Sequence, residues 1–168
     1  GGRAAVLTNS LATNDVIAAH GAYARYRDGL LDAGVELHEL APNARALHRQ
    51  VRLFKGRSRA SLHTKAMVLD RREVFVGSFN IDPRSVHLNT EMGYYVASAE
   101  LGQQVAAFIE EGLAPENSYR VDKEQGKLTW AGDGHDGRPL VLHNEPGVTV
   151  WRRMLAWLLS LLPIERML

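Results

Sequence analysis

The sequence contains no cysteine, which excludes a disulfide framework, a thiolate nucleophile and a cysteine zinc site. It also lacks a strong net charge, because 20 Lys and Arg residues are balanced by 19 Asp and Glu residues. A nearly neutral chain does not coat nucleic acid by bulk electrostatics. What remains is ordinary globular composition: 168 residues, of which 45% are hydrophobic and 23% charged, enough for one compact domain with a core.

Charge is unevenly distributed along the chain. Residues 1–60 carry a basic surplus, whereas residues 61–168 carry an acidic one. The surplus is concentrated in a run without acids that contains Arg45, Arg49, Arg52, Lys55, Arg57 and Arg59. This run can follow a nucleic-acid backbone, attract anionic lipid headgroups or form a solvated loop. Its one stacking aromatic residue, Phe54, is too little for single-stranded nucleic acid.

The first forty residues have the order strand, helix, strand. Residues 4–8 are a short apolar run, residues 16–30 repeat apolar side chains at helical spacing, and residues 35–40 are strand-like. Asn14 or Asp15 is expected to cap the helix, and Gly34 to end it. This order predicts the α/β class, with a mixed β-sheet flanked by helices.

The remainder of the chain predicts strands and two helices. A hairpin is expected over 62–70 and 74–78, a strand over 91–97, and a helix over 99–111 that Ser98 caps and Gly112 ends. Residues 118–131 predict a peripheral hairpin that turns at Gln125 and Gly126, followed by a loop over 131–139. An apolar helix is expected from about residue 150 to residue 162.

The most informative window extends from His63 to Asn80. Side chains two apart on a strand share a face, so His63 and Lys65 are expected to project together. The returning strand is expected to bring Ser78 and Asn80 beside them, and Gly77 to allow the close backbone approach that a bound anion needs. The result is an imidazole, an ammonium, a hydroxyl and a carboxamide around one point.

Those four groups suit a phosphodiester substrate. Imidazole attacks phosphorus or protonates a leaving oxygen, because its pKa of about 6.5 lies near neutral pH. Lysine supplies a compact positive charge, while Asn and Ser donate hydrogen bonds to oxygens that gain charge. Such a scheme needs no metal, and the sequence has no helical HExxH motif, so we expect no cofactor.

The window resembles the HxK(x)4D(x)6GSxN signature of the phospholipase D superfamily. The matching residues are His63, Lys65, Asp70, Gly77, Ser78 and Asn80. The resemblance implies a phospholipase D-like α-β-α sandwich and a reaction that uses two histidines. One histidine attacks phosphorus, and the other protonates the leaving alcohol.

The resemblance also implies a role for each residue. His63 is expected to act as general acid and then as general base for the incoming alcohol. Asp70 belongs to the catalytic motif, although its place at the hairpin turn and family precedent make it more structural than catalytic. Glu91 lies where family members often place an acid that orients a catalytic histidine. The phosphate is expected to bind Lys65, Ser78 and Asn80.

Further stretches resemble bacterial cardiolipin synthases, namely residues 8–15, 20–27, 85–91 and 162–165. We therefore interpret the chain as the C-terminal half of such an enzyme, with a catalytic half over 1–117. Residues 118–168 would form a hairpin, loop and apolar helix packed on or beside it. A second histidine motif would come from a missing N-terminal half or from a homodimer partner. A trimmed or processed N-terminus is the alternative explanation for a chain that starts at Gly1.

The expected function is phosphatidyl transfer between glycerophospholipids through a phosphohistidine intermediate. The alternatives are a phospholipase D-type phosphodiesterase or nuclease that uses water, and a binding half without catalysis. Nucleic acid is not expected as a partner, whereas a membrane surface is.

The expected C-terminal helix bears on that membrane surface. Thirteen helical residues reach about 20 Å, too short for a hydrocarbon core of about 30 Å. Its two tryptophans and paired arginines fit a helix lying at a membrane interface, and they fit equally a helix packed on the protein. We expect peripheral attachment to the bacterial inner membrane.

Overall fold

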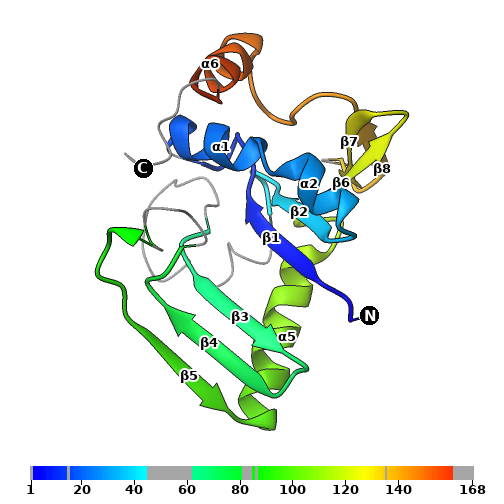
Figure 1. The fold of residues 1–168 in the computed structure, drawn as a ribbon. Helices are drawn as coiled ribbons and strands as arrows, with labels where there is room; N and C mark the ends of the chain where they lie inside the picture. The colour runs from blue at the N-terminus through cyan, green and yellow to red at the C-terminus, as the bar shows by residue number, and fades with distance from the viewer. Residues whose placement is uncertain are drawn as a thin grey trace, which may run out of the picture. The chain divides into compact units, whose positions relative to one another are not determined.

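The computed structural model describes residues 2–14, 16–44, 62–80, 85, 87–134 and 136–160 (Figure 1). These residues form two compact units, one built from the chain up to Leu62 and from Gly112 onwards, the other from His63–Glu111. Both units combine helices with sheet, which confirms the predicted α/β class. The boundary expected after residue 117 falls inside the first unit. The basic run at 45–59 lies outside the described residues.

The first unit contains a five-stranded mixed sheet in the order β1-β2-β6-β7-β8. Its strands are β1 (Ala5–Asn9), β2 (Glu36–Leu40), β6 (Ser118–Glu124), β7 (Lys127–Asp133) and β8 (Pro139–Leu142). Strands β1 and β2 are parallel, and the later pairs are antiparallel. A parallel pair needs a crossover connection, which α1 (Ile17–Ala24) and α2 (Arg27–Asp32) supply. The strand–helix–strand order expected at the N-terminus is confirmed.

The crossover is broken into two helices where one was expected. The break falls at Arg25 and Tyr26. Helix α2 then begins at Arg27, whose side chain is buried. Asn14 Oδ1 accepts a hydrogen bond from the Val16 backbone at 3.0 Å, just before α1 starts. Gly34, with φ of +79°, follows α2 and ends it as predicted, because glycine tolerates that conformation at little cost.

The hairpin of β6 and β7 is central, so the prediction that it is peripheral was wrong. Strand β6 pairs with β2, and Val121 and Trp130 belong to the same buried cluster as Leu37. The turn lies where it was expected, with positive φ at Gln125 and Gly126. The loop predicted over 131–139 is shorter, because β7 continues to residue 133 and β8 begins at residue 139.

Ion pairs occupy the interior of the first unit. Arg27 Nε lies 3.0 Å from Glu39 Oε1, and its Nη2 lies 2.7 Å from Glu145 Oε1. His20 Nε2 lies 3.0 Å from the same Glu145 oxygen. Trp130 Nε1 donates a hydrogen bond to Glu39 Oε2 at 3.0 Å. Buried charges are costly unless they are paired and hydrogen-bonded, and both carboxylates meet that condition.

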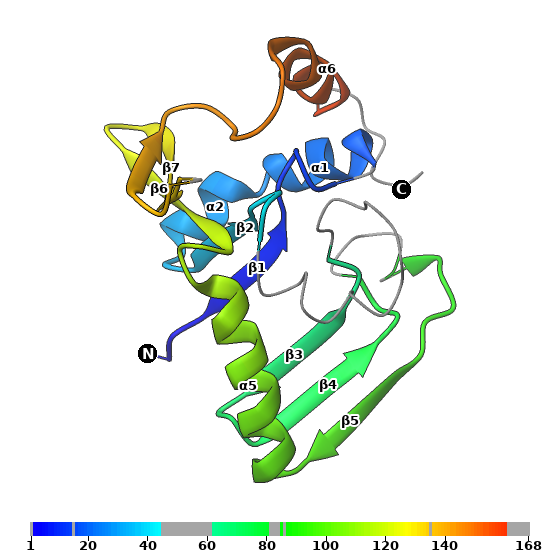
Figure 2. The same cartoon turned by 180° about the vertical axis from the view of Figure 1, so that it is seen from behind.

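Among the described residues, the second unit includes a three-stranded antiparallel sheet and the long helix α5 (Figure 2). Its elements are β3 (Lys65–Leu69), β4 (Glu73–Gly77), β5 (Gly93–Ala97) and α5 (Ala99–Leu113). The expected hairpin and the following strand are confirmed. Ser98 Oγ accepts the Leu101 N–H at 3.2 Å, which confirms the predicted cap. Gly112 does not end the helix, since α5 continues through residue 113.

Helix α6 (Val150–Ser160) follows the sheet of the first unit and packs against α1. In the ribbon it lies beside α1 on the side opposite to the strands of that unit (Figure 1). Across the described part of the chain, no helix combines the length and apolar character needed to cross a membrane.

Candidate functional site

The residues expected to act on a phosphodiester lie at one end of the β3–β4 hairpin in the second unit. His63 lies two residues before the start of β3, and Lys65 begins that strand. Ser78 and Asn80 follow the end of β4. Because the strands are antiparallel and Lys65 pairs with Gly77, all four polar residues lie at the end of the hairpin away from its turn.

The register of the hairpin differs from the expected arrangement of side chains. Lys65 is opposite Gly77, so Ser78 is one step out of phase with Lys65, and the pleat does not place both on one face. The Ser78 hydroxyl instead lies against the chain that leads into β5. It donates a hydrogen bond to Glu91 Oε2 at 2.5 Å and accepts the Met92 N–H at 3.1 Å.

Gly77 is held closely against the neighbouring strand. A Cβ atom built on Gly77 would lie 2.6 Å from the Gly93 Cα, closer than a side chain can approach. The missing side chain therefore lets β4 and β5 pair at this point. A role for Gly77 in the approach of an anion stays a prediction.

Three polar side chains surround the Glu91 carboxylate. Besides the Ser78 hydroxyl, Asn89 Nδ2 donates a hydrogen bond to Oε1 at 3.1 Å, and the buried Ser85 contributes another. The Ser78 hydrogen bond is the largest cause that holds the pKa of Glu91 below its usual range. Asn89, Ser85 and the positive charge of Lys65 lower it further, against a small opposing effect of desolvation.

Ser85 and Asn89 were not among the residues that sequence reasoning selected. They precede Glu91 by six and by two positions, and short polar side chains are common in connecting segments. The only indication in the sequence was that the candidate acid, Glu91, follows a stretch with several polar side chains. That pattern is too frequent to identify hydrogen-bond partners without the fold.

His63 is exposed in this structure, and Lys65 is half-buried. Lys65 Nζ donates a hydrogen bond to the His63 backbone carbonyl at 3.0 Å, so the ammonium lies next to the segment that carries the histidine. Among the described residues, the Glu91 carboxylate accepts hydrogen bonds from Ser78, Asn89 and Ser85 rather than from the His63 ring. The structure thus joins Ser78 to Glu91 and leaves the imidazole open to an incoming group.

Asp70 lies at the other end of β3 from Lys65. It follows Leu69 in the β3–β4 turn with φ of +49°. Four strand steps of 3.3 Å separate the two ends of β3, about 13 Å in all. The structure therefore does not bring Asp70 to the group around Lys65. Its place in the turn is the structural position that the sequence suggested.

Metal-binding side chains do not gather in the part of the chain that the structure describes. No group of three or more His, Asp or Glu residues there is arranged to hold a metal ion. The chemistry available at the end of the hairpin is that of an imidazole, an ammonium, an amide and an ionised carboxylate.

Comparisons with known proteins identify the family of the chain. The family described as cardiolipin synthase, PLD-like domain, matches residues 1–112. Cardiolipin synthase C of Escherichia coli K12 is 43% identical over 172 residues, which cover 100% of the chain and 36% of that protein. Uncharacterized proteins of Helicobacter pylori J99 and 26695 are 29% and 36% identical, over 94% and 74% of the chain and 30% and 24% of their own lengths.

The chain spans about a third, or less, of the length of these curated relatives. No solved structure matches it.

Proposed function

Because the chain belongs to the cardiolipin synthase family of phospholipase D-like domains, we propose that it supplies one histidine motif of a phosphatidyl transferase. The observation that carries the proposal is the gathering of His63, Lys65, Ser78 and Asn80 at one end of the β3–β4 hairpin. The ionised Glu91 carboxylate is held beside them. These are the groups that phosphodiester exchange by imidazole requires.

The proposed reaction has two steps. A histidine from the second motif attacks phosphorus, and a phosphorus–nitrogen bond forms while the phosphorus–oxygen bond to the leaving alcohol breaks. His63, as imidazolium, gives its proton to the leaving oxygen. The neutral His63 then takes the proton of an incoming lipid hydroxyl as that oxygen attacks phosphorus. The phosphorus–nitrogen bond breaks, and the histidine of the second motif is released. One phosphodiester replaces another, so no nucleotide is consumed.

Lys65 and Asn80 would contact the phosphate in this scheme. Lysine is a compact charge for the non-bridging oxygens, and the Asn80 amide adds hydrogen-bond donors. Ser78 has a different part, because a hydroxyl has a single proton and that of Ser78 is donated to Glu91. We propose that Ser78 fixes the carboxylate, which in turn orients a catalytic histidine.

The second histidine must come from outside the motif in this chain. The other histidines of the sequence have no lysine two positions later. The match covers only 36% of cardiolipin synthase C of Escherichia coli, so a relative of that length has room for a second motif. We propose that the partner motif lies in the remainder of a longer protein, with a second copy of the chain as the alternative.

We propose glycerophospholipids as substrates and peripheral association with the bacterial inner membrane. Cardiolipin synthase C of Escherichia coli, the relative matched over the whole chain, is named for a lipid product. Nucleic acid is not proposed as a substrate, since the chain is close to neutral overall.

Product analysis of the full-length protein with phosphatidylglycerol vesicles tests the proposal. We expect a lipid with two phosphatidyl groups, together with free glycerol. Phosphatidic acid in its place would show that water is the acceptor, as in the hydrolase alternative. His63→Ala should remove turnover, while His143→Ala, at another exposed histidine, should leave it unchanged. Normal product from folded His63→Ala protein would contradict the assignment.

A further inference from the structure

Helix α6 presents its large apolar side chains to the outside. The exposed fractions of six such residues range from 36% to 73%. They are Val150, Trp151, Met154, Leu155, Trp157 and Leu158. A surface helix of a globular protein normally turns this kind of stripe toward the core. The orientation of α6 is therefore the reverse of the usual one.

The six residues form one continuous stripe. At 100° per residue, their positions fall within an arc of about 160° that contains no polar side chain. The opposite side of the helix carries Arg152, Ala156 and Arg153, and Ala156 is buried. We call the six exposed residues the apolar arc of α6.

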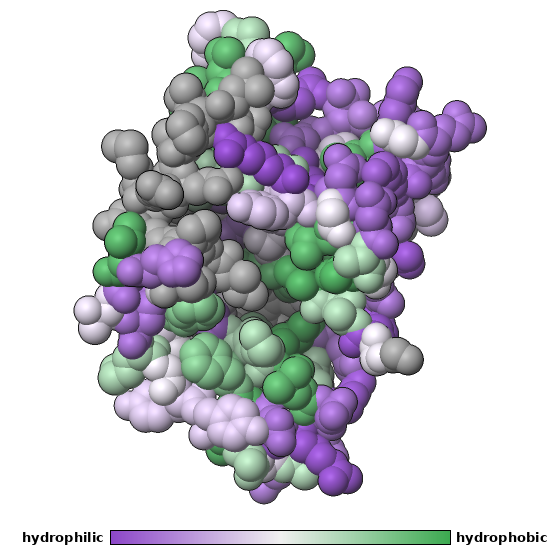
Figure 3. Space-filling model, in the orientation of Figure 1, coloured by the Kyte–Doolittle hydropathy of each residue, from purple (hydrophilic) through white to green (hydrophobic). Residues whose placement is uncertain are grey.

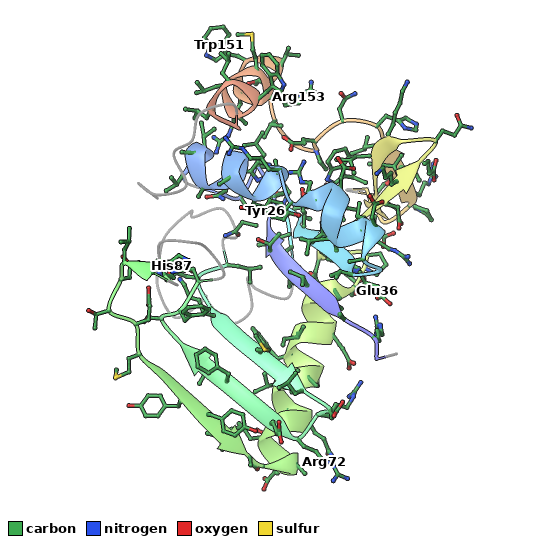
Figure 4. The ribbon with its side chains drawn as sticks, in the orientation of Figure 1. Tyr26, Glu36, Arg72, His87, Trp151 and Arg153 are labelled. Atoms are coloured by element: carbon green, nitrogen blue, oxygen red, sulfur yellow. The ribbon has the colours of Figure 1, made fainter. Side chains whose placement is uncertain are left out.

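The polar side of α6 is fixed to its own unit. Arg152 Nη2 donates a hydrogen bond to the backbone carbonyl of Asn14 at 2.7 Å. Both Arg152 and Arg153 are half-buried. Figure 4 shows Trp151 at the outer side of the helix, with Arg153 lower, where α6 meets α1. The apolar arc thus faces outward because the arginine side of the helix is anchored.

The surface of this part of the molecule has a matching pattern. Figure 3 shows hydrophobic and weakly polar residues over α6, above a strongly hydrophilic band. A contiguous exposed patch of large apolar side chains is typical of a surface that binds a membrane or another protein.

Charge and residue type point to a lipid surface as the occupant. Between residues 150 and 160 the chain has two arginines and no acid, so the helix attracts anions. On the helical wheel Arg153 lies about 40° and Arg152 about 60° beyond the margins of the apolar arc, toward the side that packs on the protein. Tryptophan is enriched at membrane interfaces, and Trp151 and Trp157 both belong to the arc.

The length of the helix fits this arrangement. Eleven residues give about 16 Å, half the thickness of a hydrocarbon core, so the helix can lie along a bilayer surface and cannot span it. Helices of this kind insert their apolar face about 5–10 Å into the boundary between headgroups and acyl chains.

We propose that α6 docks the protein on an anionic phospholipid surface, with the apolar arc inserted. The inference rests on the proposed function only in that the surface would also hold the lipid substrate. It assigns the attachment to one face of one helix, and it leaves the His63 chemistry unchanged.

A labelling experiment on the full chain tests the contact directly. The chain has no cysteine, so Met154→Cys provides a unique position in the arc for an environment-sensitive fluorophore. Val141→Cys is the matched control, because Val141 is an exposed apolar residue of β8 in the same unit. Added vesicles of phosphatidylglycerol and phosphatidylcholine should shift the emission of the label at 154 to shorter wavelength. Lipids carrying a nitroxide quencher should quench it, while the label at 141 should respond to neither.

Binding to the same vesicles measures the contribution of the arc. Met154→Glu with Leu158→Glu should weaken cosedimentation at least about tenfold, since two charges would enter the interface. Val141→Glu should bind as the unchanged chain does. Arg153→Gln should weaken binding about fivefold on anionic vesicles, because each basic residue near such a surface contributes about that factor.

Two results would overturn the proposal. One is equal vesicle binding by the unchanged chain and the folded double glutamate variant. The other is a label at 154 that is already shielded without vesicles in an oligomer detected by light scattering, which would make the arc a protein interface. The proposed function fails separately, because His63→Ala should bind vesicles normally. Absence of phosphatidyl transfer by the unsubstituted full-length protein, together with intact vesicle binding, would count against the proposed chemistry alone.

Discussion

The Ser78 hydroxyl donates its one proton to the Glu91 carboxylate, at 2.5 Å between Oγ and Oε2. The hydroxyl oxygen also accepts the N–H of Met92, the residue that follows Glu91. Ser78 therefore joins the end of β4 to the segment that enters β5, and it fixes the position of the acid. In this arrangement the serine of the GSxN motif binds the Glu91 carboxylate.

Removing the Ser78 hydroxyl should raise the pKa of Glu91 toward its ordinary value. The hydrogen bond from Ser78 is the largest cause of the lowered pKa, so Ser78→Ala removes stabilisation of the ionised form. A pH titration of the Glu91 carboxyl by NMR measures the change. Thr90→Ala, at the exposed neighbouring residue, should leave the pKa as it is. An unchanged pKa in Ser78→Ala would show that Asn89 and Ser85 suffice.

Replacement of either proposed phosphate ligand should slow phosphatidyl transfer. Lys65→Ala and Asn80→Ala are each expected to lower the rate about 10²–10³-fold, the usual loss for one electrostatic stabiliser of a transition state. Lys65→Arg should recover only part of the rate, because a planar fork replaces a point charge. Lys127→Ala, at the first residue of β7, is the control. Normal rates in all three variants would place the phosphate elsewhere.

Gly77→Ala should destabilise the sheet of the second unit. The added methyl group would meet the backbone at Gly93, which cannot move without separating β4 from β5. We expect a loss of about 1–3 kcal/mol in the free energy of unfolding, the usual cost of overpacking. Gly29→Ala is the matched control, because its Cβ would meet no atom within 4 Å and alanine favours the helix α2. Urea denaturation compares the two, and equal stability would refute the close approach.

Acid should weaken the first unit through Glu145. Burial raises the pKa of this carboxyl, but the hydrogen bond with His20 and the charge of Arg27 outweigh it and lower the pKa from 4.5 to about 2. A carboxyl whose pKa is lower in the folded state stabilises it above the unfolded pKa. That stability is lost as the pH falls from about 4.5 to about 2.

The effect can be isolated by comparing Glu145→Gln with the unchanged chain in urea between pH 2 and pH 7. The stability of the variant should depend less on pH in the window below 4.5. The difference in the free energy of unfolding between the two should shrink by about 1–3 kcal/mol on acidification. Glu116→Gln, at an exposed acid of the same unit, should follow the unchanged chain. Parallel curves for all three proteins would exclude a special role for Glu145.

Local patterns in the sequence predicted local structure well. The apolar run over residues 4–8 lies largely in strand β1, Ser98 caps a helix, and Gln125 with Gly126 makes the expected turn. Each of these depends on a few neighbouring residues, whose backbone preferences suffice to predict them.

Contacts between residues far apart in the sequence could not be predicted from such local patterns. The alternation in β6 and β7 fits a half-exposed hairpin as well as a central one, and only pairing with β2 decides between them. The break before Arg27 depends on Glu39 and Glu145, which attract its guanidinium into the interior. In the site, the motif located Ser78 correctly along the chain, but its direction follows from the lead into β5.

The order in which the ribosome releases the chain matters for the buried pairs of the first unit. His20 and its partner Glu145 are 125 positions apart in the sequence. Glu39 accepts a hydrogen bond from Trp130, which lies 91 positions later. While the protein is being synthesised, β1, β2 and their crossover helices therefore emerge with an open strand edge. Arg27 and Glu39 can already pair, but Glu145 and Trp130 are still missing. Most of the second unit comes from a single segment, His63–Glu111, and the sheet within that segment can form before the first unit is complete. The nascent chain should thus expose its incomplete N-terminal sheet until translation passes residue 145, the interval in which chaperone binding is most needed.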